Sequence, residues 1–219
     1  MVHSHRGIAW VVTLALLCLH TPSPSAAANL AAGDPVIEAI WRVQSLPFEY
    51  HSLSTYYDCD SLQEKVRAIL HAVGAHRSLI VDARCEGGVT NRISARIVLA
   101  TPVPATEENV RAATTFDTRD ELVARLRNVA LPTASDITRF PARWQTLSLG
   151  RVRDVSLTVG DCDLLRGMYE QVFPKIAVRV TENNRMHCGN YASRLRPNVK
   201  VEALVADPLP DNPLAQSTL

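Results

Sequence analysis

One motif appears twice in this chain, as YYDCDSL at residues 56–62 and as VGDCDLL at residues 159–165. A second cysteine follows each copy at the same distance, because Cys59 and Cys85 stand 26 positions apart and so do Cys162 and Cys188. Between the two cysteines, each copy has apolar residues at helical spacing and then an alternating run that is typical of a strand. The matched spacing indicates that the two segments share one local fold.

Each copy is predicted to form a strand, a helix and two further strands. The predicted elements are strands at residues 48–57, 78–84 and 92–100 around a helix at 62–73, then strands at 153–159, 175–182 and 198–206 around a helix at 165–173. Leu122, Val123, Leu126 and Val129 mark a connecting helix, with a capping box from Thr118 and Glu121, and residues 143–149 predict an extra strand. We therefore expect an α+β protein made by tandem duplication of a β-α-β-β unit.

The chain begins with the features of a secretory signal peptide. Arg6 precedes an apolar run at residues 8–19, and small residues follow at 26–28. The apolar run is too short for the ~20 residues that span a bilayer, so cleavage is favoured over an uncleaved anchor or a buried helix. The expected organisation is a signal peptide at 1–28, a first unit at 29–104, a connector at 105–150, a second unit at 151–206 and a disordered tail at 207–219.

Cleavage would place the mature protein in the periplasm or outside the cell, with no transmembrane segment. It would remove Arg6 and no other charged residue, which lowers the formal net charge from +1 to zero. A neutral chain is not steered toward nucleic acid or anionic lipid by its net charge. We therefore expect no nucleic-acid partner.

Four cysteines remain after Cys18 leaves with the signal peptide, and they permit three pairings. In a strand-helix-strand crossover the second strand returns beside the first, so the start of the helix and the end of the second strand share one sheet edge. This geometry predicts disulfides Cys59–Cys85 and Cys162–Cys188, one in each unit. The alternative is an activated thiol at a helix N-terminus, but there is no Cys-x-x-Cys and the flanking carboxylates would raise a thiol pKa.

The flanking aspartates have a structural interpretation as well, with Asp60 and Asp163 expected as helix N-caps. The sequence contains no recognisable nucleophile motif, helical metal-ligand pair or phosphate-binding loop. No catalytic, cofactor-binding or metal-binding residue is assigned, and no cofactor is expected. Paired carboxylates for glycoside hydrolysis stay open, because such partners meet only in three dimensions.

Arginine follows the second cysteine in both copies. These residues are Arg92 and Arg96 in the first copy and Arg194 and Arg196 in the second. If the copies pack with pseudo-twofold symmetry, the four guanidinium groups could line a groove for carboxylate or phosphate. The alternative is that they are ordinary solvated arginines.

The first copy resembles a family of small, uncharacterised exported proteobacterial proteins. The shared pattern is a Tyr-x-Cys-Asp segment, then Leu-x-x-Lys-Val and Gly-Ala before a second cysteine. In this chain these are Tyr57-Asp58-Cys59-Asp60, Leu62 to Val66, Gly74-Ala75 and Cys85. The resemblance implies an envelope protein and supplies no catalytic residue.

The sequence as a whole favours a non-catalytic binding or envelope-associated module. Its expected partner is an envelope component or a small anionic ligand. The competing prediction is a hydrolase that acts on cell-envelope material.

Overall fold

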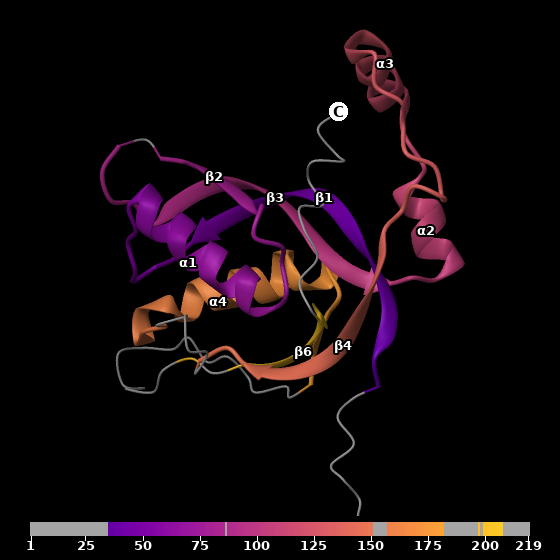
Figure 1. Cartoon of the computed structure of the whole chain (residues 1–219). Helices are drawn as coiled ribbons and strands as arrows, with labels where there is room; N and C mark the ends of the chain where they lie inside the picture. The colour runs from indigo at the N-terminus through magenta and orange to yellow at the C-terminus, as the bar shows by residue number, and fades with distance from the viewer. Residues whose placement is uncertain (1–34, 86, 151–156, 182–196, 198, 208–219) are drawn as a thin grey trace, which may run out of the picture. The chain divides into compact units, whose positions relative to one another are not determined.

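The described residues form twelve helical and strand segments, the first beginning at Ile37 and the last ending at Ala206 (Figure 1). The computed structural model describes residues 35–85, 87–150, 157–181, 197 and 199–207. In chain order the elements are β1 (Ile37–His51), α1 (Cys59–Ala72), β2 (Ile80–Arg84), β3 (Arg92–Pro104), α2 (Glu107–Ala113), α3 (Thr118–Arg127), β4 (Arg139–Ser148), the 3₁₀ turn η1 (Val159–Asp161), α4 (Cys162–Gln171), the 3₁₀ turn η2 (Phe173–Lys175), β5 (Val178–Val180) and β6 (Lys200–Ala206). The predicted α+β class is confirmed.

The strands form one six-stranded sheet in the order β2-β3-β1-β4-β6-β5, and every neighbouring pair is antiparallel. The prediction that the second strand returns directly beside the first is wrong, because β3 lies between β1 and β2. Both strands are antiparallel to β3 and therefore run in the same direction. The start of α1 and the end of β2 thus still share one edge of the sheet.

The second half of the sheet has the same order of connections. The chain passes from β4 through α4 to β5, and β6 then pairs between β4 and β5. The strand predicted as an extra element of the connector is therefore β4, which lies at the centre of the sheet. The strand predicted at 153–159 lies mostly outside the described residues, and Leu157 and Thr158 do not form a strand.

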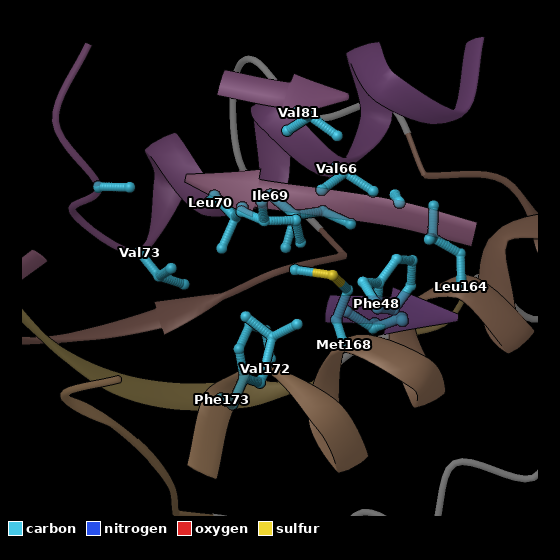
Figure 2. Close-up of a cluster of buried hydrophobic side chains, with 14 of the residues drawn as sticks. Phe48, Val66, Ile69, Leu70, Val73, Val81, Leu164, Met168, Val172 and Phe173 are labelled. Atoms are coloured by element: carbon cyan, nitrogen blue, oxygen red, sulfur yellow. The ribbon is translucent and has the colours of Figure 1, made fainter. Parts of the chain in front are cut away.

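Helices α1 and α4 pack on the same face of the sheet. Helix α1 buries Leu62, Val66, Ile69 and Leu70, at the i, i+4, i+7 and i+8 spacing of one helical face. Helix α4 buries Leu164, Leu165 and Met168, which belong to the same buried cluster as Phe48 of β1. Figure 2 shows Leu164 and Met168 beside Phe48. Full burial of each such side chain contributes roughly 2 kcal/mol, so the helices and the sheet stabilise each other.

Helix α4 packs against β1 beyond the point where β1 ceases to pair with β4. These two strands pair only over Ile37–Ile40 and 139–142. Further along β1, the side chain of Gln171 accepts from the backbone N–H of Glu49 at 2.9 Å and donates to its carbonyl at 2.8 Å. An added Cβ at Gly167 would lie 3.3 Å from the ring of Phe48, so glycine lets α4 approach β1 closely.

The connector between β3 and β4 forms two short helices. The sequence did not predict α2, because its seven residues bury only Val110. Helix α3 was predicted, but its capping box joins Asp117 and Asp120, one residue earlier than expected. The residue that accepts the first helical N–H groups therefore lies before the threonine, where its extended backbone is compatible with a cap.

The turn after α1 requires glycine at residue 74. Gly74 has φ of +90°, and an added Cβ would lie 2.7 Å from the carbonyl oxygen of Leu204 on β6. Gly87 has nearly the same φ of +87°, but nothing lies within 4 Å of its Cβ position. Substitution of Gly87 would therefore introduce backbone strain alone, whereas substitution of Gly74 would introduce strain and a steric clash.

We predict that Gly74→Ala destabilises the protein by about 3 kcal/mol, whereas Gly87→Ala costs only the ~1 kcal/mol of a left-handed backbone. The additional loss arises because β6 cannot move away from α1 without leaving β4. Urea unfolding of both variants measures the difference. Equal losses would show that β6 yields to the added methyl group.

Candidate functional site

A polar cluster lies where the two Asp-Cys-Asp segments meet. Its centre is the carboxylate of Asp161, which is 1% exposed. Thr158 donates to it from the backbone N–H at 2.6 Å and from the hydroxyl at 2.9 Å. From the first half of the chain, Lys65 Nζ donates at 2.9 Å and the hydroxyl of Tyr57 donates as well. One buried carboxylate therefore joins α1 and the loop before it to the turn that begins α4.

The hydrogen bonds determine the charge of this cluster. Burial opposes ionisation of Asp161, but the hydrogen bonds from Thr158, Tyr57 and Lys65 outweigh it and hold its pKa below the ordinary value of 3.8. Burial and the hydrogen bond to Asp161 raise the pKa of Tyr57 well above its usual range. At neutral pH the site therefore holds an ionised carboxylate and a protonated phenol.

A second set of contacts surrounds Asp163, two residues further on. Ser52 donates to one of its carboxylate oxygens at 2.6 Å, and Arg166 donates to the other at 2.6 Å. The Ser52 oxygen in turn accepts from the backbone N–H groups of Ser54 and Thr55. The loop after β1 is thus folded onto the first turn of α4.

Two tyrosine rings pack beside these contacts. Tyr50 and Tyr57 meet edge to face with their ring centroids 5.1 Å apart. The Tyr50 hydroxyl donates to the carbonyl of Thr55, and burial raises its pKa to about 12. Both phenols are therefore hydrogen-bond donors at neutral pH, and neither is a ready base.

The expected N-caps at Asp60 and Asp163 are wrong by two residues. Asp58 is the N-cap of α1, and its carboxylate accepts from the backbone N–H and the hydroxyl of Ser61, both at 2.8 Å. Asp161 is the N-cap position of α4, but its carboxylate faces back to Thr158 and makes no bond to the helix. The first aspartate of each motif, and not the second, occupies the cap because the cysteine is already helical.

The cysteines agree with a structural role. Cys59 and Cys85 form a disulfide with their Cα atoms 6.0 Å apart, as predicted. It closes a loop of 26 positions, for which chain entropy gives a stabilisation of roughly 3 to 4 kcal/mol. Cys162 is also disulfide-bonded. Cys188 lies outside the described residues, so the pairing Cys162–Cys188 stays a prediction.

The arginines predicted to line a groove are described in part. Arg92 and Arg96 point away from the helices, on the exposed face of β3, and Arg96 Nε donates to Ser45 Oγ at 2.9 Å. The sequence missed Arg84, which pairs across the sheet with Ser94 and therefore lies on the same face between them. The alternating pattern of residues 78–84 could have placed Arg84 on the exposed face of this strand. Arg194 and Arg196 lie outside the described residues.

The described residues show no group of three or more His, Cys, Asp and Glu side chains that could hold a metal ion. Among the same residues, no helix has the length and apolar character that crossing a membrane requires.

Comparison with known proteins gives no match to a family model, to a curated protein or to a solved structure.

The Asp161 cluster can be tested against its counterpart in the first motif. We predict that Asp161→Asn lowers the free energy of unfolding by about 3 kcal/mol at pH 7, the lower end for removing one partner of a buried pair, because Lys65 can turn to solvent. Asp58→Asn should have little effect, since asparagine is also a good N-cap at this exposed position. Urea unfolding measures both. A loss for Asp58→Asn that equals the loss for Asp161→Asn would contradict a special role for Asp161.

The free energy of unfolding should also depend on pH in a way that involves Asp161. The pKa of Asp161 is lower in the folded than in the unfolded chain, so its contribution is complete above 3.8 and disappears as the pH falls through the folded value. The stability difference between the parent protein and Asp161→Asn should therefore shrink below pH 3.8.

Proposed function

We propose that this protein is exported and works in the periplasm or outside the cell as a non-catalytic binding or envelope-associated module. One observation carries the proposal: side chains of the repeated Asp-Cys-Asp motif make contacts that stabilise the fold. Cys59 is held in a disulfide, Asp58 caps α1 and the Asp161 carboxylate receives four hydrogen bonds. A disulfide that stabilises a fold persists in oxidising compartments, which supports export.

We also infer that the chain arose by tandem duplication of a β-α-β-β unit. Three observations support this inference. The connections β1-α1-β2-β3 and β4-α4-β5-β6 have the same order. The last strand of each series, β3 or β6, lies between the other two strands of that series. An Asp-Cys-Asp motif stands at the start of both α1 and α4. The second unit would then begin at β4, before residue 151.

The proposed ligand is an anionic group, bound by Arg92 and Arg96 on the first unit and by Arg194 and Arg196 on the second. Arg84 adds a third guanidinium beside Arg92 and Arg96 on an exposed three-stranded face. Asp82 and Glu49 share this face, so its net charge is small and any binding must depend on the position of single arginines. Planar guanidinium groups suit carboxylate and phosphate oxygens.

Export predicts a shortened N-terminus. Intact-mass spectrometry of the protein purified from its native host should find a chain that begins near Asn29, in the periplasmic or culture fraction. Recovery of the chain with Met1 from the cytoplasm would contradict export, whatever the protein binds.

Anion binding predicts a position-specific effect of arginine. On an immobilised anionic polymer such as heparin, Arg92→Ala/Arg96→Ala should elute at lower salt than Arg42→Ala/Arg111→Ala, which removes the same charge from other exposed positions. Melting temperatures should be nearly unchanged, because exposed substitutions usually cost within about 0.5 kcal/mol. Equal elution of the two variants would make Arg92 and Arg96 ordinary surface residues.

A further inference from the structure

Two of the three arginines on the exposed face of β2 and β3 have no partner in the described part of the chain. Arg92, Ser94 and Arg96 alternate along β3, and Arg84 of β2 pairs directly with Ser94. Arg96 Nε donates to Ser45 Oγ at 2.9 Å. The guanidinium groups of Arg84 and Arg92, in contrast, make no hydrogen bond or ion pair with the described residues. They are therefore the two that are available to a ligand.

The acidic residues of this face lie opposite other side chains. Asp82 pairs directly with Arg96, on the side of Arg84 that is away from Arg92. Glu49 pairs with Ser94, and its carboxylate accepts from the Ser94 hydroxyl at 2.7 Å. Directly opposite residues on neighbouring strands interact most strongly, because their Cβ atoms lie about 5 Å apart. Asp82 therefore offsets the charge of Arg96 in particular, and Glu49 is held by the serine.

The sheet places Arg84 and Arg92 close enough to share one small anion. Because Arg84 pairs with Ser94, Arg92 is its diagonal neighbour on β3. Diagonal neighbours in an antiparallel pair lie roughly 7 to 8 Å apart, which is within reach of two long side chains. Like charges at this separation repel each other, and an anion between them would remove that repulsion.

The backbone is fixed at both arginines. Arg84 precedes Cys85, which is disulfide-bonded. Arg92 follows Asn91, whose carbonyl accepts from the backbone N–H of Ser52 at 3.0 Å and whose side-chain amide donates to the Ser52 carbonyl at 2.9 Å. Binding would then have to order only the two side chains, which lowers its entropic cost.

Two guanidinium groups suit a phosphate group better than a carboxylate. One planar guanidinium can occupy both oxygens of a carboxylate, which leaves few acceptor positions for a second guanidinium. A phosphate monoester presents three acceptor oxygens and a charge of about −2 at neutral pH, so it can accept from both. We propose that Arg84 and Arg92 together bind a phosphate monoester group. This inference rests on the proposed function, names the class of the anion and assigns the main contacts to these two residues.

An NMR titration of the isotope-labelled, oxidised protein with inorganic phosphate tests the site. The backbone amide signals of Arg84 and Arg92 should shift together, with a dissociation constant in the millimolar range because the contacts are exposed. Acetate, titrated at the same ionic strength, should bind at least about fivefold more weakly, because a carboxylate serves only one guanidinium well. Equal affinity for the two anions would overturn the assignment of a phosphate.

Single substitutions test whether both arginines hold the same anion. Arg84→Ala and Arg92→Ala should each weaken phosphate binding at least about fivefold. Arg96→Ala, the matched control on the same face, should weaken it less than about twofold. The double variant Arg84→Ala/Arg92→Ala should lose less than the product of the two single losses, since one anion contacts both groups. Melting temperatures should stay nearly unchanged, because all three positions are exposed.

The result that overturns this site differs from the result that overturns anion binding. Equal losses for all three arginines, or single losses that multiply, would show a diffuse basic surface and no shared site. Elution from heparin that depends on Arg92 and Arg96 would then still support the proposed function. A parent protein that binds neither inorganic phosphate nor heparin contradicts both proposals.

Vesicles distinguish two sources of the phosphate group. Phosphatidic acid in phosphatidylcholine vesicles presents a lipid phosphate monoester, whereas phosphatidylcholine alone does not. Co-sedimentation that requires phosphatidic acid and is lost in Arg84→Ala would assign the site to a lipid. Binding of inorganic phosphate without co-sedimentation would assign it to a soluble phosphate ester.

Discussion

The burial of one carboxylate constrains how the two halves of this chain meet. Asp161 can be buried as an anion only if donors surround it, since an unpaired buried charge costs several kcal/mol. Two of its donors, Tyr57 and Lys65, come from the first half of the chain. The two halves of the sheet share only a short ladder between β1 and β4, so the sheet alone fixes their relation weakly. The hydrogen bonds to Asp161 and the packing of α4 against β1 supply the rest.

The first aspartate of the Asp-Cys-Asp motif has a different structural role in each copy. Asp58 is exposed and caps α1, whereas Asp161, at the equivalent place before the next helix, is buried and does not cap α4. The residue before each aspartate explains the difference. Tyr57 in the first copy reaches Asp161, while Gly160 in the second leaves room for Thr55, which lies 3.4 Å from its Cβ position. A motif that is similar in its two copies thus has two different roles, because the first copy supplies the donors Tyr57 and Lys65 and the second supplies the acceptor Asp161.

Local patterns predicted the elements better than their arrangement. The periodicity of α1 and the alternation of β2 and β3 were sufficient, and they gave the disulfide Cys59–Cys85. The insertion of β3 between β1 and β2 could not be predicted, because either order places these cysteines at the same edge. The long N-terminal part of β1 was missed since its exposed and buried residues do not alternate regularly near Trp41. The Asp161 cluster was inaccessible to sequence reasoning, because Lys65 and Tyr57 lie 96 and 104 positions away.

The connector between the halves is more than a spacer. The segment predicted as the connector, residues 105–150, contains β4, through which the two halves of the sheet are joined, and α3, whose Leu122 and Leu126 are exposed. These two parts differ in what stabilises them. Strand β4 pairs on both sides and contributes Phe140 and Ala142 to a buried cluster, so its structure is secured within the chain. Helix α3 buries Ala124, and its capping box and an exposed ion pair between Glu121 and Arg125 stabilise it. Strand β4 is therefore part of what joins the two halves of the sheet, whereas α3 contributes little to the described core.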